Sequence, residues 1–424
     1  MRISMKTINR ISLGLMIALL FVPILARFVK IIIFYPILFA WLFSATMIDP
    51  RWISLKRSGI VYIVYICLLC FLVYATQNSS AFLSKILTVI LISYSSLFIY
   101  SFYRKHLDII RDYGWFLYLC LAAGLVTTIP GLIHYPIAAR ILATADPVYT
   151  RERELYQQIG IGGYDYIYSL VLYCIFMPAM TRHCSPRQKT VFRILFLAFL
   201  FCIILSGYTM AILFALLFTA MSVYFTRRKK QSGGIMLIAI LLIFVLWFAR
   251  EPILTAIADL TDRLNVYYAS TRIRQLLDAT EGSGLESLER MRLYENGWIN
   301  FTRSPLVGVM AGPTLLKSGH SEALYYLETF GLLGLPYHFK LFFTQRNNSL
   351  CVRERTVRIC LICCQVFFVV FSFVNRTDVA YSVMWSIYFV LPILSLTLDD
   401  RAAVPPFRED RTISDFGRKP KDNT

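Results

Sequence analysis

Residues 31–48 read IIIFYPILFAWLFSATMI and contain no charged side chain. Arg27 and Lys30 precede this run and Arg51 follows it, so basic residues bound an uninterrupted apolar stretch. A helix of about 17 to 25 such residues crosses the roughly 30 Å hydrocarbon core of a bilayer, and similar runs along the chain predict about twelve membrane spans. Their approximate bounds are 9–25, 31–48, 58–75, 81–102, 115–134, 165–181, 190–206, 209–226, 234–249, 322–343, 358–374 and 379–398.

The composition of the whole chain agrees with a protein built into a bilayer. The 424 residues are 57% hydrophobic and 16% charged, and the mean hydropathy is +0.60. Soluble domains are about 45 to 50% apolar and about 25% charged. The sequence therefore predicts an all-α, polytopic integral membrane protein. Residues 1–398 are expected to form one membrane domain, with an anchored first helix rather than a removed signal peptide, and 399–424 a disordered tail.

Lys and Arg alternate from loop to loop along the chain. Basic residues precede the first predicted span and follow the second, fourth, sixth, eighth and tenth. By the positive-inside rule these loops and both termini are expected to be cytoplasmic. The opposite loops are short and carry little charge, apart from 135–164 and 250–322, and long loops cross a membrane regardless of their arginines. The net charge of +18 therefore indicates topology and contact with anionic lipids rather than a nucleic-acid partner.

The long outer loop 250–322, between the ninth and tenth predicted spans, is the chain's longest hydrophilic stretch. Connections in compact proteins are usually far shorter, and long ones tend to carry function. The planar donor fork of arginine suits phosphate or carboxylate, but pairing with Asp and Glu in the same loops is an equally open alternative. The arginines of the two outer loops are Arg140, Arg151, Arg153, Arg250, Arg263, Arg272, Arg274, Arg290, Arg292 and Arg303.

Local signals predict short helices inside this loop. Residues 285–302 have helical spacing of apolar positions, and Ser283 with Glu286 forms a capping-box pattern ahead of them. Arg290 and Arg292 therefore lie on a helix, where Glu286 and Glu295 are placed to form ordinary surface pairs with them. A Pro and Gly turn at 305–308 is expected to lead the chain back toward the membrane.

His320 lies directly before Ser321, which is a predicted N-cap for the tenth span. The free N–H groups and the positive dipole end of a helix favour an anion at this position. A neutral imidazole there can accept a proton or donate a hydrogen bond. The alternative is a solvated histidine that only neighbours the cap.

Several motifs, taken in order, resemble the O-antigen polymerase and ligase superfamily. GHSEALYYLETFGLLG at 319–334, preceded by a helix led by Arg290 and a Pro and Gly turn, is similar to its His-Ser and Gly-x-x-Gly signature. GIGGYDYIYSL at 160–170 resembles the Gly-Tyr-Asp stretch of the polymerase branch. LSGYTMA at 205–211 resembles the family's Ser-Gly turn, although Tyr208 stands where the ligases commonly have Arg. The motifs cover a small part of the chain, whereas the order of spans resembles the family over nearly its whole length.

The resemblance implies a GT-C type membrane glycosyltransferase that acts on a polyprenyl-diphosphate-linked oligosaccharide. It implies polymerisation of repeat units into O-antigen, capsule or exopolysaccharide at the outer face of the bacterial inner membrane. A chain-length regulator and a flippase are the protein partners that such an enzyme is expected to have. No paired-Asp motif for a divalent cation is present, so neither a metal nor another cofactor is expected. Arginines would then stabilise the diphosphate leaving group, and one direct displacement would invert the anomeric carbon.

The candidate catalytic residues are Arg290, as a clamp on the diphosphate, and His320, which orients or deprotonates the attacking hydroxyl. Glu328 is a secondary candidate, because a carboxylate inside a span is costly. It lies three residues before Gly331, where the family's acidic residue usually lies two before its Gly. The remaining candidates for diphosphate or sugar binding are Arg292, Arg140, Arg151, Arg153, Arg303, Tyr164, Tyr294 and Trp298, with Glu295 as a further secondary residue.

Two other functions stay open. A ligase of the same superfamily would transfer a finished glycan to lipid A core or to a protein, but Ser321 after the histidine and the Gly-Tyr-Asp segment favour a polymerase. A polysaccharide flippase or other transporter would show repeated halves, broken spans and charges near mid-bilayer. The chain has no convincing internal repeat, and Lys85, Glu328 and Lys340 are among the few charges inside predicted spans.

Overall fold

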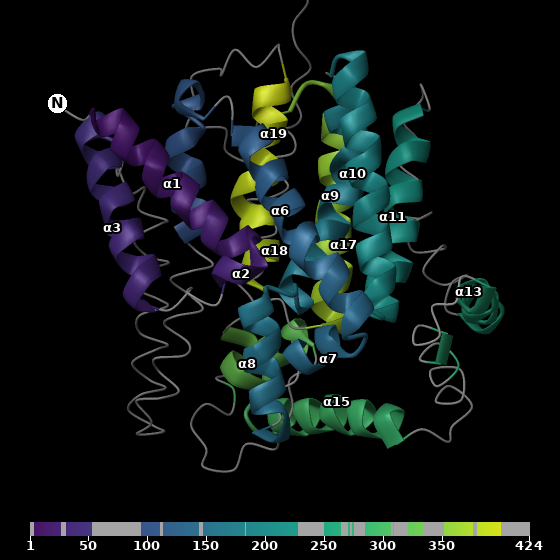
Figure 1. Ribbon diagram of the computed structural model, residues 1–424. Coiled ribbons are helices and arrows are strands. Elements are labelled where there is room, and N and C mark those ends of the chain that lie inside the picture. The colour runs from purple at the N-terminus through teal and green to yellow at the C-terminus, as the bar shows by residue number, and fades with distance from the viewer. Residues whose placement is uncertain are drawn as a thin grey trace, which may run out of the picture.

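The computed structural model is helical throughout the part of the chain that it describes, and no strand occurs there (Figure 1). The all-α prediction is therefore confirmed for this part. The described residues are 4–26, 31–52, 95–110, 113–143, 147–182, 184–227, 250–263, 270–271, 274, 285–306, 308, 321–333, 352–375 and 380–399.

Five of the described helical runs are long and apolar enough to cross a membrane. They are α6 (Tyr113–His134), α10 (Pro186–Leu205), α11 (Thr209–Arg227), α17 (Arg355–Val374) and the continuous run of α18 (Tyr381–Trp385), the π-helix η4 (Ser386–Val390) and α19 (Leu391–Leu398). A sixth is the pair α8 (Thr150–Ile159) and α9 (Tyr164–Arg182), if these helices, bent by 45°, are one span. The protein is thus an α-helical membrane protein.

The shorter and more polar helices complete the described fold. They are α1 (Met5–Phe21), α2 (Pro23–Ala26), α3 (Ile31–Ile48), the 3-10 helices η1 (Leu107–Ile109) and η2 (Pro147–Tyr149), α7 (Ala138–Ala143), α13 (Arg250–Arg263) and α15 (Leu285–Arg303). Residues 95–103 and 322–333 are helical as well. The two helices α13 and α15 lie in the hydrophilic insertion, where short helices were predicted.

Eight of the predicted apolar runs coincide with described helices to within a few residues. The first corresponds to α1 and α2, which are parted at Val22, and the second to α3. The others correspond to α6, α9, α10, α11, α17 and the run α18–η4–α19. The predicted spans 58–75 and 234–249 and most of 81–102 lie outside the described residues, so the prediction of twelve spans stays a prediction.

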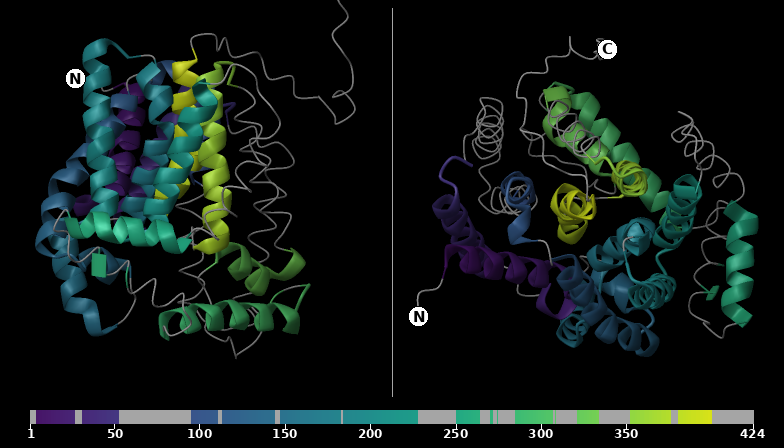
Figure 2. Two further views of the ribbon diagram at one scale, coloured as in Figure 1. Left: turned by 90° about the vertical axis from the view of Figure 1, so that its right-hand side faces the viewer. Right: turned by 90° about the horizontal axis from the view of Figure 1, so that it is seen from above.

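Helix α9 forms the centre of the bundle. Every side chain from Tyr166 to Met177 is buried, because α10, α11, α17 and α18 pack around it (Figures 1 and 2). A helix that is apolar on all sides is stable only inside such a shell. Helix α10, by contrast, leaves Ile194 and Leu197 on an exposed outer face. That surface suits contact with lipid.

The segments that connect the helices lie at two opposite ends of the bundle. At one end, Lys6 forms an ion pair with Asp108 at 3.2 Å, and Arg182 forms one with Glu354 at 3.2 Å. The N-terminus therefore contacts the loop after the fourth predicted span, and the loops after the sixth and tenth predicted spans contact each other. Helices α7, α8 and α15 lie at the other end, in the lower half of Figure 1. Both long hydrophilic segments thus contribute helices to the same end of the bundle.

The GIGG stretch at 160–163 determines where α9 begins. Gly160 ends α8 with a φ of +81°, a left-handed conformation that glycine adopts readily. Thr127 Oγ1 on α6 donates to the Gly160 carbonyl at 2.7 Å, and the Gly162 N–H donates to Thr128 Oγ1 at 2.9 Å. A Cβ atom on Gly162 would lie 2.2 Å from the Tyr166 ring. Only glycine allows α8 to turn into α9 this close to α6.

Replacement of Gly162 by Ala is expected to lower stability, because the Tyr166 ring is held by a hydrogen bond from its hydroxyl to the Leu121 carbonyl at 2.6 Å. Overpacking of this kind costs about 1 to 3 kcal/mol. The apparent unfolding temperature in detergent measures it. Gly14→Ala is the matched control, since a Cβ there meets no atom closer than 3.6 Å. An unchanged unfolding temperature for Gly162→Ala would contradict the packing.

Candidate functional site

Helix α15 lies across the end of the bundle rather than along it (Figures 1 and 2). Its bounds, Leu285–Arg303, confirm the helix predicted from spacing over 285–302. The Ser304 N–H donates to the Phe301 carbonyl at 3.1 Å, and the Gly308 N–H donates to the Ser304 carbonyl at 2.8 Å. Gly308 has a φ of +74°, so the Pro and Gly turn ends the helix as predicted.

The C-terminal end of α17 anchors the insertion. The last carbonyls of a helix have no partner within it, and burying them unpaired is costly. Three donors from the insertion reach these carbonyls. The Tyr294 hydroxyl, the Ser321 hydroxyl and the Glu322 N–H donate to the carbonyls of Val374, Ser372 and Asn375 at 3.1, 3.5 and 3.2 Å, respectively.

Ser321 also caps the next helix. Its hydroxyl accepts from the Leu324 N–H at 3.3 Å, which confirms the N-cap prediction. One side chain therefore satisfies a free N–H of the helix that it starts and reaches a free carbonyl of α17. His320, the predicted catalytic residue directly before it, lies outside the described residues. So does the side chain of Arg290, although its backbone belongs to α15.

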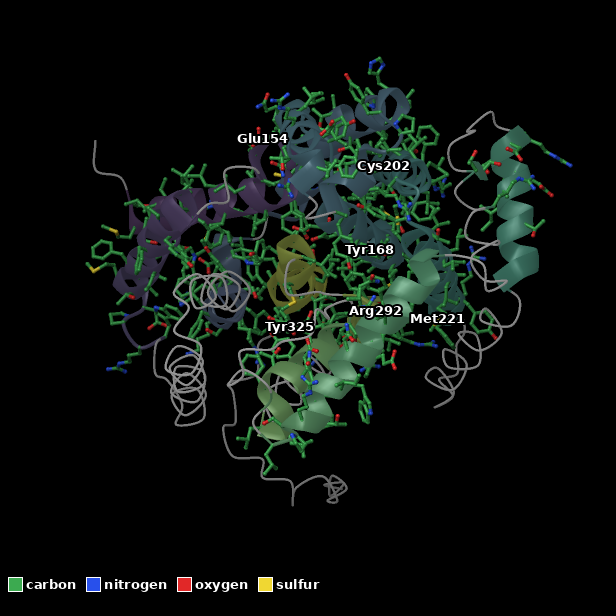
Figure 3. The ribbon with its side chains drawn as sticks, turned by 90° about the horizontal axis from the view of Figure 1, so that it is seen from below. Glu154, Tyr168, Cys202, Met221, Arg292 and Tyr325 are labelled. Atoms are coloured by element: carbon green, nitrogen blue, oxygen red, sulfur yellow. The ribbon has the colours of Figure 1, made fainter. Side chains whose placement is uncertain are left out.

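Residues 322–333, the described half of the predicted tenth span over 322–343, run parallel to α15. Asn300 Nδ2 donates to Glu328 Oε2 at 3.3 Å. The N–H groups of Leu332 and Leu333 donate to the carbonyls of Pro305 and Leu306 at 2.8 and 3.1 Å. All three pairs are 27 or 28 residues apart (328 − 300, 332 − 305, 333 − 306). Figures 2 and 3 show the two segments side by side.

Two glycines bring the ends of the two segments into close contact. Gly331 has a φ of +60°, and a Cβ there would lie 2.5 Å from the Leu306 backbone. A Cβ atom on Gly308 would lie 2.1 Å from the Thr329 carbonyl oxygen. These two glycines let the ends of the two segments touch. The rest of the predicted span, from residue 334, lies outside the described residues.

Glu328, a secondary candidate from the sequence, joins the two segments. It is 2% exposed, and the amide of Asn300 donates to it from the buried face of α15. Gly297, one turn before Asn300, leaves room for it, because a Cβ there would lie 3.1 Å from Glu328 Oε2. A buried carboxylate needs such a donor. The geometry therefore indicates a structural role for Glu328.

The opposite face of α15 carries most of the predicted ligands of that helix. Arg292, Glu295, Trp298 and Arg303 are exposed on it, with Trp298 56% exposed. Within the described residues no ion pair joins Arg292 to Glu295, so the predicted surface pair does not form. Tyr294 does not belong to this face, since its hydroxyl is used on α17. The structure thus separates an anchoring tyrosine from an exposed cationic and aromatic face.

The first hydrophilic loop brings three more predicted arginines to this end. Arg140 is on α7, and Arg151 and Arg153 are on α8. The Tyr208 hydroxyl donates to the Ala139 carbonyl, which holds α7 against the turn between α10 and α11. Arg151 is exposed and Arg153 half-buried.

Tyr164, at the start of α9, belongs to a cluster of aromatic rings at this end of the bundle. Its ring centroid is 4.7 Å from that of Tyr168 and 6.0 Å from those of Tyr208 and Phe371. In Figure 3 Tyr168 lies on the bundle side of α15, whose Arg292 is labelled beside Tyr325 of the neighbouring segment. We call these four rings, Tyr164, Tyr168, Tyr208 and Phe371, the aromatic floor of this end of the bundle.

Two carboxylates at this end were not proposed from the sequence. Asp165 accepts from the Ser382 N–H at 3.0 Å and from its hydroxyl, so α9 caps the start of α18. Glu322 is 4% exposed, and its N–H donates to the Asn375 carbonyl at 3.2 Å. A Glu in the first turn of a helix is ordinary in a sequence. Only its tertiary contacts distinguish Glu322 from such an ordinary residue.

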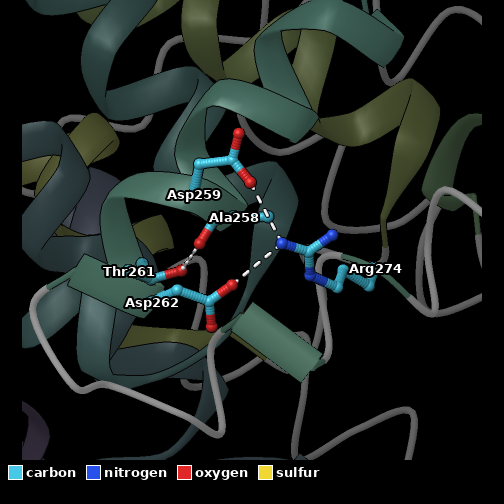
Figure 4. Close-up of polar contacts among 5 residues, drawn as sticks. All are labelled: Ala258, Asp259, Thr261, Asp262 and Arg274. Atoms are coloured by element: carbon cyan, nitrogen blue, oxygen red, sulfur yellow. Dashed lines mark hydrogen bonds and ion pairs between the residues drawn. The ribbon is translucent and has the colours of Figure 1, made fainter.

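Arg274 confirms the alternative that some arginines of the insertion pair internally. Its Nη2 atom lies 3.0 Å from Asp259 Oδ1 and 2.9 Å from Asp262 Oδ2 (Figure 4). A hydrogen bond from Ser270 and the Arg274 guanidinium lower the pKa of the Asp262 carboxyl. Both carboxylates lie on α13. Arg274 is therefore held by α13 and differs from Arg151, Arg292 and Arg303, for which the described residues supply no ion-pair partner.

Replacement of Asn300 by Ala is expected to loosen α15 from 322–333, because the buried Glu328 carboxylate loses a donor. A hydrogen bond to a charged group contributes about 1.5 to 3 kcal/mol. Hydrogen exchange should speed up in both segments, while Thr302→Ala, on the exposed face of the same helix, should leave exchange unchanged. Equal exchange in the two variants would show that the bridge does not hold the segments together.

Comparisons with known proteins assign no function to this chain, so its function is inferred from the geometry above. No protein-family model matches the sequence, and no curated protein matches it. In the described ranges, no group of three or more His, Cys, Asp or Glu side chains is placed to hold a metal ion. The site is therefore defined by its arginines, its aromatic floor and its buried carboxylates.

Proposed function

We propose that this protein polymerises polyprenyl-diphosphate-linked oligosaccharide repeat units into a surface polysaccharide such as O-antigen, capsule or exopolysaccharide. One observation carries the proposal: two separate hydrophilic segments bring exposed arginines to the same end of an apolar bundle. Arg151 comes from α8, and Arg292 and Arg303 come from α15. A lipid diphosphate presents its charge at the rim of the bilayer, next to its apolar tail. A bundle end that carries arginines next to an apolar surface therefore suits a lipid diphosphate.

The end with α7, α8 and α15 would face outward from the bacterial inner membrane. The opposite end carries Lys6 and Arg182, and basic residues are enriched in cytoplasmic loops. Both termini would then be cytoplasmic. The lipid-linked substrate would reach the site from the outer leaflet after a flippase has moved it there. A GT-C type fold with about twelve spans is the architecture that we expect for such an enzyme.

The chemistry would be transfer of the growing chain from its lipid diphosphate to a hydroxyl of one lipid-linked repeat unit. Arginine donors form bidentate hydrogen bonds with phosphate oxygens and stabilise the charge that the leaving diphosphate acquires. Arg290 and Arg292 with Arg151 or Arg153 are the proposed clamp, and His320 orients the acceptor. Direct displacement would invert the anomeric carbon. Trp298 and Tyr164 offer aromatic faces for sugar rings.

Deletion of the gene, followed by gel analysis of surface polysaccharide, tests the proposal. A polymerase predicts loss of the polymer ladder with retention of a core bearing one repeat unit. Loss of every repeat from the core would identify a ligase instead. Accumulation of lipid-linked units on the cytoplasmic side would identify a flippase and would overturn the assignment to either enzyme.

Alanine replacements of single arginines test the clamp at matched membrane expression. Arg292→Ala and Arg151→Ala are expected to reduce polymer formation by about 10²- to 10³-fold, the usual effect of removing one donor to a developing charge. Arg274→Ala is the matched control, because Asp259 and Asp262 already hold that guanidinium, and it should leave the ladder unchanged. Full polymer from both Arg292→Ala and Arg151→Ala would remove these residues from the mechanism.

A further inference from the structure

Helices α6 and α10 pack against each other and turn apolar faces outward (Figure 1). Of the five described runs that can cross a membrane, α10 has the smallest buried share. Exposed on the two helices are Leu119, Val126 and Ile133 of α6 and Ile194, Leu197 and Phe201 of α10. Both faces suit contact with lipid tails.

The first two turns of α10 are basic as well as apolar. They carry Arg187, Lys189 and Arg193. Arg193 follows the first residue of the helix by seven positions (193 − 186), which is about 10 Å along a helix that crosses the membrane. Its side chain is exposed, and so is that of Ile194 beside it. A guanidinium at this depth has to reach the headgroup region and needs a counter-ion there.

The two helices supply no counter-ion of their own, because neither α6 nor α10 contains an Asp or Glu. Within the described parts of the chain, no ion pair involves a basic residue of α10. Lys6 and Arg182 at the same end of the bundle are, by contrast, paired with Asp108 and Glu354. The cations of α10 thus lie on a lipid-facing helix without an acid beside them in the described structure.

Trp115 lies at the seam between α6 and α10, next to these cations. Its ring centroid is 5.1 Å from that of Phe192 on α10, and 46% of the tryptophan is exposed. Lys189 is three residues before Phe192 and four before Arg193, spacings that place side chains next to each other on a helix. Tryptophan is enriched at the level of lipid headgroups. An interfacial tryptophan and two cations therefore mark the place where the two apolar faces begin.

We propose that the seam between α6 and α10 binds one anionic phospholipid, an inference that does not depend on the function proposed above. The phosphodiester oxygens accept hydrogen bonds from the Arg193 guanidinium and the Lys189 ammonium, and the acyl chains lie along Leu119 and Leu197. The planar fork of arginine suits phosphate. A zwitterionic headgroup carries its own ammonium, so a lipid with net negative charge fits unpaired cations better.

This lipid site is separate from the candidate functional site. Helix α10 begins directly after Arg182, at the end of the bundle where Arg182 pairs with Glu354. The arginines of α8 and α15 belong to the opposite end. In the proposed topology the lipid therefore comes from the cytoplasmic leaflet, which is rich in basic residues of membrane proteins and attracts them through its anionic lipids.

Native mass spectrometry of the full-length protein in detergent, titrated with phosphatidylglycerol or phosphatidylcholine, tests the binding. The first phosphatidylglycerol is expected to bind at least about tenfold more tightly than phosphatidylcholine. Arg193→Gln is expected to weaken phosphatidylglycerol binding by about 10- to 100-fold, because it removes charge-assisted hydrogen bonds to phosphate. Lys6→Gln, the matched control, also removes one positive charge at this end and is expected to keep the preference.

Amine-reactive labelling of the unsubstituted protein tests the position of the lipid without a mutation. Lys189 in nanodiscs of phosphatidylcholine is expected to react more slowly once phosphatidylglycerol is included, because its ammonium then contacts the phosphodiester. Lys6, which is paired with Asp108 away from the seam, is expected to react at the same rate in both. Absence of protection at Lys189 would overturn the proposal even if Arg193→Gln did not fold.

The remaining outcomes separate a site from general attraction. Equal affinity of the unsubstituted protein for the two lipids, or an unchanged preference in Arg193→Gln, would overturn the proposal. Equal weakening in Arg193→Gln and Lys6→Gln would assign the preference to net charge and overturn it too. A dimer that protects Lys189 in both lipid compositions would assign the seam to a second copy of the chain instead of a lipid.

Discussion

The C-terminal turn of α17 is the point on which the candidate site depends. A helix that ends at the rim of a membrane leaves carbonyls without partners, and few alternatives to a protein donor exist there. Tyr294, Ser321 and the Glu322 N–H supply these donors from a segment that follows α11 in the chain. Each bond contributes about 0.5 to 1.5 kcal/mol. Together they orient the insertion, which places its arginines on the exposed face of α15.

The rest of the site follows from tight packing on the other side of the bundle. The glycines at 160 and 162 bring the start of α9 against α6, which sets the position of Tyr164. Asp165, the next residue, holds the N-terminus of α18 through Ser382. Helix α9 therefore sets the position of the aromatic cluster, and α17 sets the position of α15. The arginine-bearing helix α15 and the buried residue Glu322 are thereby held against the same helix bundle.

Local signals in the sequence predicted much of this arrangement. Apolar runs predicted α3, α6, α10, α11 and α17 closely, because the length of a lipid-crossing helix is physically fixed. Helical spacing predicted α15, and the Ser321 cap was predicted from residue type alone. Contacts between distant segments were not predictable in this way. Residues 322–333 have the hydropathy of a span, yet their neighbours are α15 residues. The anchoring role of Tyr294 and the burial of Glu322 depend on the same long-range contacts.

A disulfide between α15 and the 322–333 segment tests most directly that the insertion is folded onto itself at the bundle end. A Cβ atom on Gly297 would lie 2.9 Å from Leu324 Cγ, the atom bonded to the Leu324 Cβ. The two Cβ atoms are therefore near the separation of about 3.5 to 4.5 Å that a disulfide requires. Mild oxidation of the Gly297→Cys, Leu324→Cys protein in membranes is predicted to give a bridged peptide pair by mass spectrometry. Thr302→Cys, Leu324→Cys is predicted to stay reduced. Equal bridging in both proteins, or none in either, would contradict the parallel pairing on which the site is built.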